Sequence, residues 1–487
     1  MSNLSELLPT GGGQNSVDFV ASGTLASGQT VALKTNGQVE AVGLSSSSVA
    51  ENVGTEAQFE NAKPTYTRTA FDAESGKVVI SYTDGGNSNY GTVVIGTVSG
   101  NTISFGTAVV YNSTSANWNS LVYDSTNKKT IVSYMLSTNL TGYAKVGTVS
   151  GTSISFGSAV QFSATSDNPA YISSSFDTSA GKTVTAYTAG GAGSYAKAVV
   201  GTVSGTSISF GSVVVFRSAN TQEFACVYDT NANKTVILYR ESSVSGAGEG
   251  IVGTVSGTSI SFGSAVQFDS SPVTVVRGAY DSLTNQVICA YTKVTTKVVL
   301  GTVSGTSISF GAIVTAPTTE SSNYNAVAYD SNVNKIVLVA SEYGVDGTIV
   351  TGTVSGTGLS FVSPATEFNP SDVSNWNATA YDSFNKKVVL SYTKNNASGQ
   401  ALVFQAAGTV TTSNSADFIG ITAEAISSAA TGAVNVYGGI NAVQTGLTIA
   451  SDYYVQADGS LSTTSTSPAI KVGQAISATT INMKDLT

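Results

Sequence analysis

The sequence predicts an all-β fold, and three observations support this. Only 10% of the 487 residues are charged and 50 are Gly, which suits short strands joined by tight turns. The string Gly-Thr-Val-Ser-Gly recurs along the chain, and so does an aromatic residue followed by Asp. Both markers count seven units of about fifty residues, a spacing typical of the blades of a propeller. We therefore predict a seven-bladed β-propeller.

The markers divide the chain into comparable units. The first marker, degenerate in its last copy, begins at Gly96, Gly147, Gly201, Gly253, Gly301, Gly352 and Gly408. The second ends at Asp72, Asp124, Asp177, Asp229, Asp281, Asp330 and Asp382. Each unit reads as four strands, which we name a to d in chain order. In the second unit they are expected at residues 117–124, 129–135, 142–150 and 152–162.

The recurring Asp opens the turn between strands a and b. An Asp side chain accepts backbone N–H bonds in such a turn, and Gly or Asn tolerates the positive φ that closes it. Five units place Gly or Asn near the end of the turn: Gly76, Gly181, Asn233, Asn285 and Asn334. We interpret the seven carboxylates as turn formers rather than catalytic groups, because a catalytic residue is not needed seven times.

The seventh unit lacks a strand d. The N-terminal residues 53–61, VGTEAQFEN, match residues 262–270, FGSAVQFDS, in their Gly, Gln and Phe. We expect residues 49–59 to complete the seventh blade, so that the propeller spans residues 47–411 and its ring has no open sheet edge.

Both flanks of the propeller also read as β structure. Turn signals occur at residues 35–37, Thr-Asn-Gly, and at residues 457–459, Ala-Asp-Gly. Because ring closure brings the two flanks together, we predict that residues 16–46 and 412–487 form one small β-barrel or sandwich into which the propeller is inserted. Residues 1–15 are left as an N-terminal attachment tail.

Several segments resemble virion proteins of tailed bacteriophages, particularly marine and cyanobacterial ones. They are LSELLPTGGGQN (4–15), ASGTLASGQTVALKTNGQVEAVG (21–43), FIGITAEAI (418–426), GLTIASDYYVQADGSLSTT (446–464) and IKVGQAISATTINM (470–483), together with the GTVSGTSISFGSAV repeat. The resemblance implies a virion surface location in a tail fibre, an appendage or a head decoration. It implies contacts with other virion proteins through the N-terminal tail and the composite β-domain, and it allows a homo-oligomer.

The loops of the propeller divide between two faces. The a–b and c–d turns are nearly uniform and share one face, whereas the b–c and d–a loops vary and share the other. Since both flanks join the uniform face, we expect the variable face to point away from the particle, where it can contact host-surface polysaccharide.

An aromatic residue stands six residues before the turn Asp in five units, at the variable end of strand a. These residues are Tyr66, Trp118, Tyr171, Tyr324 and Trp376. One interpretation is a ring of platforms for sugars around the tunnel mouth, with Asn119, Asn325 and Asn377 as hydrogen-bonding neighbours. The other is packing between blades, which repeated aromatic residues in propellers commonly serve.

Charge and composition argue against several other classes of protein. A net charge of −9 argues against nucleic-acid binding, which takes clustered Lys and Arg. We find no secretion signal and no apolar stretch that could span a bilayer, so we expect synthesis in the host cytoplasm and no membrane insertion. Cys226 and Cys289 read as buried free thiols, and we predict no metal or other cofactor.

These features favour a non-enzymatic virion structural protein that displays a propeller for host-surface or glycan contact. The alternative is a glycan-degrading glycosidase or a sialidase-like propeller enzyme. The chain has no His and only four Arg, which disfavours that alternative. Two carboxylates on either side of a sugar would suffice for hydrolysis, and Asp84, Glu241 and Glu342 follow strand b in three units, but we expect them to be solvated at loop tips.

Overall fold

The computed structural model describes residues 15–191, 193–243, 245–318, 324–341, 347–369, 372, 374–467 and 469–483. The predicted attachment tail, apart from Asn15, lies outside these ranges. The chain divides into two compact units, residues 49–408 and a composite of residues 1–48 with 409–487. Within the described ranges no helix is long and apolar enough to cross a membrane.

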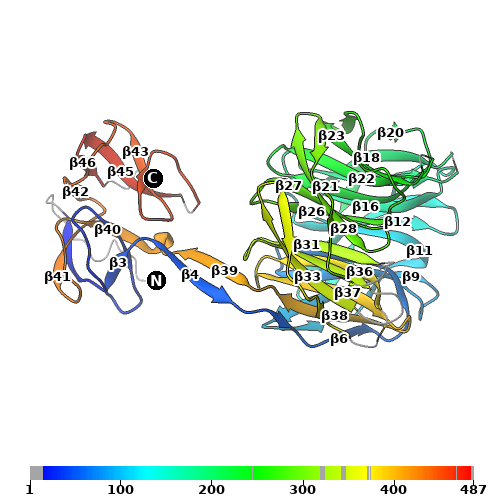
Figure 1. The fold of residues 1–487 in the computed structure, drawn as a ribbon, viewed down its shortest axis with the longest axis horizontal. Helices are drawn as coiled ribbons and strands as arrows, with labels where there is room; N and C mark the ends of the chain where they lie inside the picture. Colours follow the sequence, from blue (N-terminus) through cyan, green and yellow to red (C-terminus); the bar gives the residue numbers. More distant parts are fainter. Residues whose placement is uncertain are drawn as a thin grey trace. The chain divides into compact units, whose positions relative to one another are not determined.

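Residues 49–408 form seven antiparallel groups in which strands a, b and c pair in order (Figure 1). Strand a is β7 (Pro64–Asp72), β11 (Val109–Asp124), β16 (Pro169–Asp177), β21 (Thr221–Asp229), β26 (Thr274–Asp281), β31 (Asn325–Asp330) or β36 (Ser374–Asp382). Strand b is β8 (Lys77–Asp84), β12 (Lys129–Leu136), β17 (Lys182–Ala189), β22 (Lys234–Glu241), β27 (Gln286–Thr292), β32 (Lys335–Ser341) or β37 (Lys387–Lys394). Strand c is β9 (Tyr90–Ser99), β13 (Thr141–Ser150), β18 (Tyr195–Ser204), β23 (Ala247–Ser256), β28 (Thr296–Ser304), β33 (Gly347–Ser355) or β38 (Ser398–Gln405).

Strand d is divided into two short strands that both pair with strand c, whereas the sequence pattern predicted one continuous strand. The first half is β10 (Thr102–Phe105), β14 (Ser153–Phe156), β19 (Ser207–Phe210), β24 (Ser259–Phe262), β29 (Ser307–Phe310) or β34 (Gly358–Phe361). The second half is β15 (Val160–Gln161), β20 (Val214–Arg217), β25 (Val266–Asp269), β30 (Val314–Thr315) or β35 (Thr366–Glu367). In the first group, the second half of strand d is the start of β11. Because β11 continues as strand a of the second group, it joins the two groups into one nine-stranded sheet.

A close approach between neighbouring groups explains this break. A Cβ added to Gly157, at the break, would lie 1.9 Å from the carbonyl oxygen of Thr206 in the next group. Gly is therefore required where the outer strand passes the neighbouring c–d turn.

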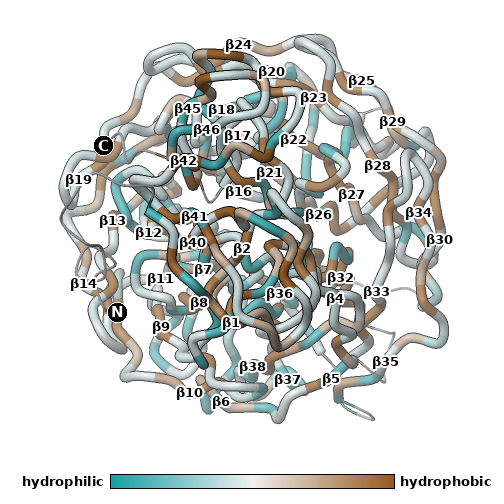
Figure 2. The backbone as a smooth tube through the Cα atoms, turned by 90° about the vertical axis from the view of Figure 1, so that its left-hand side faces the viewer, coloured by the Kyte–Doolittle hydropathy of each residue, from teal (hydrophilic) through white to brown (hydrophobic). Residues whose placement is uncertain are grey.

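The groups form a closed β-propeller ring. Strand a of each group contacts strand a of the next, and β36 contacts β7. Apolar clusters lie between adjacent groups: Ile80 packs in one cluster with Val389, and Ile131 packs in another with Tyr187. Figure 2 views the ring end-on, with the d strands β19, β24, β29 and β34 along its rim. The core is thus distributed between the groups, as in other β-propellers.

The N-terminal segment supplies strand d of the seventh group. Strands β5 (Asn52–Val53) and β6 (Ala57–Glu60) pair with β38, Val53 opposite Phe404 and Glu60 opposite Gly399. A Cβ on Gly54 would lie 2.0 Å from the carbonyl oxygen of Asn101 in the first group. The seam therefore repeats the contact that Gly157 makes elsewhere in the ring.

The seven turn Asp side chains are buried and cap their own turns. Asp124 Oδ1 accepts hydrogen bonds from the backbone N–H groups of Thr126 at 2.9 Å and Asn127 at 2.8 Å. An Oδ1 bond of this kind occurs in every group. The residue that closes the turn has a φ of +53° to +65° in all seven groups, although two of them use Lys128 and Lys386 there. The interpretation as turn formers is confirmed.

The flanks combine into a β-sandwich. One sheet holds β1 (Ser16–Val20), β2 (Thr30–Leu33), β3 (Val39–Ala41), β40 (Phe418–Thr422) and β41 (Thr431–Val436). A short 3-10 helix, η2 (Ser415–Asp417), directly precedes β40. The other holds β42 (Ile440–Asn441), β43 (Asp452–Val455), β44 (Leu461–Ser462), β45 (Ile470–Ser477) and β46 (Thr480–Asn482). β2 pairs with β40 across the two flanks, and one apolar cluster includes Ile421 of the first sheet and Val472 of the second. The connecting strands β4 (Leu44–Val49) and β39 (Gly408–Ser413) pair with each other.

Candidate functional site

A repeated β-bulge marks the start of strand a in six groups. In the second group the register against strand b shifts between Asn117 and Ser120. The residue within each shift has a positive φ: Tyr66 (52°), Trp118 (57°), Tyr171 (52°), Glu223 (57°), Val275 (51°) and Trp376 (53°). Bulky side chains rarely adopt this conformation, and bulges redirect side chains beside functional sites. A strained backbone conformation thus sets the direction of these six side chains.

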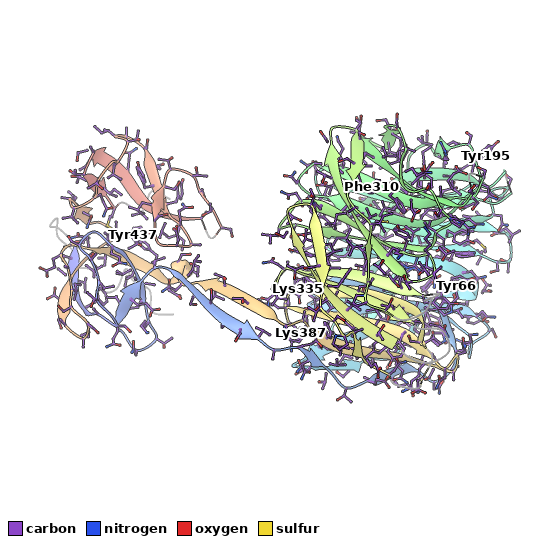
Figure 3. The ribbon with its side chains drawn as sticks, viewed as in Figure 1. Tyr66, Tyr195, Phe310, Lys335, Lys387 and Tyr437 are labelled. Carbon is purple, nitrogen blue, oxygen red and sulfur yellow. The ribbon has the colours of Figure 1, made fainter. Side chains whose placement is uncertain are left out.

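The sixth group reaches the same place without a bulge. Tyr324 directly precedes β31 and keeps the spacing of six residues to its turn Asp. We call the seven positions, Tyr66, Trp118, Tyr171, Glu223, Val275, Tyr324 and Trp376, the mouth of the ring. Figure 3 shows Tyr66 on the opposite side of the propeller from Lys335 and Lys387, the residues that open strand b.

The five predicted aromatic residues form one continuous arc. Ring centroids are 4.4 Å apart for Tyr171 and Trp118, 5.0 Å for Trp118 and Tyr66, 4.6 Å for Tyr66 and Trp376, and 5.2 Å for Trp376 and Tyr324. Each contact joins two neighbouring groups, so the arc serves packing, the second of the two predicted roles. All five rings are nevertheless only partly buried.

A cavity of about 300 Å³ opens at the mouth. It is lined by Trp118, Tyr171, Glu223, Val275, Tyr324 and Trp376, and by Arg68, Ile172, Phe224 and Arg277. Four of the five aromatic residues, all except Tyr66, therefore combine contacts between groups with surface that faces the cavity. Binding of a sugar by these residues stays a prediction.

The Asn residues beside the arc are not available to a ligand at the mouth, and this part of the prediction is wrong. Asn119 is fully buried and Asn377 is 2% exposed. Asn377 Nδ2 donates to the Tyr324 carbonyl at 3.0 Å, and Asn119 Oδ1 accepts from the Tyr111 hydroxyl at 2.9 Å. Asn325 is also buried and donates to Thr292. Side chains alternate along strand a, so the amide that follows each aromatic residue turns between the groups.

The mouth tyrosines present neutral hydroxyl groups. The hydroxyls of Tyr66, Tyr171 and Tyr324 have no hydrogen-bond partner among the described residues. Burial raises the pKa of all three, and the nearby carboxylate of Glu223 raises the pKa of Tyr171 and Tyr324 further. They can donate hydrogen bonds but are poor sources of a phenolate.

The carboxylates after strand b were predicted to be solvated at loop tips, and this prediction is wrong for Asp84 and Glu241, which are buried. Glu241 is fully buried, and its Oε2 accepts a hydrogen bond from Arg217 Nε at 2.7 Å. Asp84 is 8% exposed, its Oδ1 accepts from the backbone of Gly86, and burial raises its pKa. Neither lines the mouth cavity. Asp84 is satisfied within its own group, and Glu241 is satisfied by Arg217 of the preceding group and by Ser243 of its own, while Glu342 lies outside the described residues.

Sequence reasoning missed a second repeated contact. A buried Tyr of strand b donates its hydroxyl to a carboxylate in five groups, as Tyr187 does to Asp167 at 2.9 Å and Tyr291 to Asp269 at 2.9 Å. The remaining pairs are Tyr82 with Glu60, Tyr239 with Glu249, and Tyr392 with Glu56. The recurring Tyr of strand b was a visible signal, but its partners lie at unequal spacings. These pairs satisfy buried polar groups.

The two thiols are free, as predicted. Cys289 is fully buried as predicted, whereas Cys226 is only partly buried, with its thiol directed at the Ser173 carbonyl oxygen 3.3 Å away. Burial raises the pKa of the Cys226 thiol to about 12, so it is not a reactive thiolate.

Comparisons with known proteins concern the fold. No protein-family model and no curated protein matches the chain. The chain is similar to the leech intramolecular trans-sialidase in complex with 2,7-anhydro-Neu5Ac (10% identity, 72% of this chain and 68% of that one, TM-score 0.43). It is similar to the Ruminococcus gnavus intramolecular trans-sialidase in complex with oseltamivir carboxylate (9%, 71% and 96%, 0.42). It is also similar to the BP39L lectin of Burkholderia pseudomallei (11%, 72% and 100%, 0.48).

Proposed function

We propose that this protein is a non-enzymatic structural protein of a tailed-bacteriophage virion, and that the mouth of its propeller binds glycans on the host surface. The observation that carries the glycan-binding part is the arc of five partly exposed aromatic rings, four of which line one cavity. The virion part rests on the resemblance of both flanks and of the repeat to phage virion proteins.

The arc has the chemistry that sugars need. Aromatic faces stack on the apolar faces of sugar rings while polar tips reach the hydroxyls. The cavity of about 300 Å³ lies at the small end of ligand pockets, which fits one or two sugar units rather than a long chain. The two tyrosines that line the cavity, Tyr171 and Tyr324, add hydroxyl groups that can bond to a ligand without breaking a protein contact.

The lining of the cavity favours binding over cleavage. Glycoside hydrolysis ordinarily uses two carboxyl groups on either side of the bond that breaks. Glu223 is the one carboxylate among the described residues that line the mouth cavity. A tyrosine nucleophile is disfavoured because the pKa of each mouth tyrosine is raised. Release of reducing sugar from a bound glycan would reverse this conclusion in favour of the glycosidase or sialidase-like alternative.

A glycan array tests the binding part. The full chain is labelled and compared with Trp118→Ala and Trp376→Ala. Phe384→Ala is the matched control, because it removes a 63% exposed aromatic residue from an a–b turn. We expect wild type and Phe384→Ala to retain the same glycans and both Trp variants to lose them. Equal retention by all four folded proteins would place any binding away from the mouth and contradict the proposal.

Immunogold labelling tests the virion part. Antibodies raised against the composite β-domain are applied to intact particles from the phage that carries this sequence. We expect gold on every particle at one fixed type of position. Signal confined to the soluble fraction of the lysate, with bare particles, would contradict the virion assignment and leave glycan binding standing.

A further inference from the structure

One set of seven equivalent positions, one on each strand a, carries side chains that differ in size and charge. The position two residues after each mouth position carries Arg68, Ser120, Ser173, Ala225, Arg277, Ala326 or Ala378. All seven line a second cavity of about 150 Å³, further along the same strands. Two of the four arginines of the chain thus stand in a ring of otherwise small residues. Both also line the mouth cavity.

The two arginines come from non-adjacent groups, Arg68 from β7 and Arg277 from β26. Among the described residues, each donates one hydrogen bond, to the carbonyl of its preceding residue, Thr67 at 2.8 Å and Val276 at 2.9 Å. A guanidinium carries five N–H donors. Most donors of the pair therefore have no acceptor among the described residues and stand beside open space.

The charge of this set of positions is not balanced. Glu223 is the nearest carboxylate, and its Oε2 lies 3.7 Å from Arg277 Nη1, beyond hydrogen-bond distance. Burial, with the like charge of Arg277 close by, lowers the pKa of Arg68 to about 9, and burial also lowers the pKa of Arg277. Two cations against one carboxylate in a confined cavity are stabilised by a bound anion.

We propose that Arg68 and Arg277 bind an oxyanion, a carboxylate or a sulfate, carried by a sugar whose ring lies against the aromatic arc. This inference rests on the proposed glycan binding and narrows it to acidic glycans. Guanidinium groups match both oxyanions because their planar N–H pairs can donate two parallel bonds. The small side chains at the other five positions leave the room that the anion occupies.

Glu223 occupies a mouth position that five other groups give to aromatic residues, and it faces Arg277 as a competing internal anion. A ligand oxyanion must displace or share that weak contact. Removing the charge of Glu223 should therefore strengthen binding of an acidic glycan. This direction of change cannot result from misfolding.

Arrays of neutral, carboxylated and sulfated oligosaccharides, followed by calorimetry on the retained sugars, test the inference. The full chain is compared with Arg68→Gln, Arg277→Gln and Glu223→Gln. Lys128→Gln is the control for loss of one positive charge, since Lys128 is 58% exposed on an a–b turn. We expect acidic glycans to bind about ten-fold more weakly to either Arg variant. They should bind more tightly to Glu223→Gln and equally to Lys128→Gln, and the carboxylated and sulfated arms identify the oxyanion.

The outcomes separate the two proposals. If neutral glycans bind as well as acidic ones, and neither Arg68→Gln nor Glu223→Gln changes these affinities, the oxyanion site is overturned. Glycan binding itself would still stand. Retention of no glycan by the folded wild-type protein would overturn the glycan-binding proposal and this inference together.

Discussion

Trp118 and Tyr171 stand against each other at the mouth of the ring, with centroids 4.4 Å apart and an angle of 47° between their planes. They come from β11 and β16, strands of neighbouring groups, and both line the mouth cavity. The same pair therefore joins two groups and presents surface to a ligand. Stability and affinity must be measured separately to distinguish the two roles.

Tyr171→Phe keeps the ring and removes the hydroxyl. Since that hydroxyl has no partner among the described residues, we expect an unchanged free energy of unfolding in urea. Glycan affinity should fall by about 0.5–1.5 kcal/mol, the net worth of one hydrogen bond.

Tyr187→Phe is the matched control with the opposite pattern. Its hydroxyl is buried and donates to Asp167 at 2.9 Å, so the variant should lose about 1–3 kcal/mol of stability and keep its affinity. Equal effects of the two variants on both measurements would contradict this division of roles.

Gly54→Ala tests ring closure. The new Cβ would lie 2.0 Å from the Asn101 carbonyl oxygen and 2.8 Å from that of Val403, so backbone must move on both sides of the seam. We expect a loss of about 1–3 kcal/mol in unfolding free energy. Gly43→Ala is the control, because its Cβ meets nothing within 4 Å. A Gly54 variant as stable as the Gly43 variant would mean that the seam is not closed in this way.

Lys386→Asn should stabilise the protein. Lys386 closes an a–b turn with a φ of +56°, a conformation that Asn adopts more readily. We expect a gain of about 0.5–1 kcal/mol in thermal or urea unfolding. Gly181→Ala, at the equivalent position with a φ of +63°, should lose about as much. Shifts in the same direction for both variants would argue against the turn conformation.

The buried carboxyl group of Asp330 should make the stability of the protein depend on pH. Burial raises its pKa to about 6, whereas the carboxyl of an unfolded chain titrates near about 3.9. The folded state thus holds this proton more tightly, and the contribution is present below pH of about 4 and lost as pH rises through about 6. Asp330→Asn removes the titration, so its stability relative to wild type should increase over that range. A relative stability that does not vary from pH 4.5 to 7.5 would contradict the shift.

Much of this fold could be predicted from the sequence, because the repeated features of the fold depend on residues close together in the chain. Turn chemistry repeats at fixed spacing from Asp72 to Asp382, and the Gly and Phe of residues 53–61 identify the missing outer strand. The site was harder to predict. The bulge shifts the alternation of strand a, which sent Asn119 and Asn377 into the interior although they adjoin Trp118 and Trp376.

Long-range pairing accounts for the rest. Arg68 and Arg277 share a cavity because the ring closes, and buried Glu241 is paired with Arg217 from the outer strand of the preceding group. Neither relationship has a fixed sequence spacing. Periodicity therefore predicts the architecture and the location of the mouth, while the charges inside the mouth require coordinates.

Tryptophan fluorescence tests the central claim most directly. The chain has two Trp residues, Trp118 and Trp376, and both line the mouth cavity. A glycan retained on the array is titrated into the wild-type protein and into Trp118→Phe and Trp376→Phe, with calorimetry in parallel. We predict a saturable emission change in all three, with the dissociation constant that calorimetry gives for each protein. Calorimetric binding with no change in emission from either tryptophan would contradict binding at the mouth.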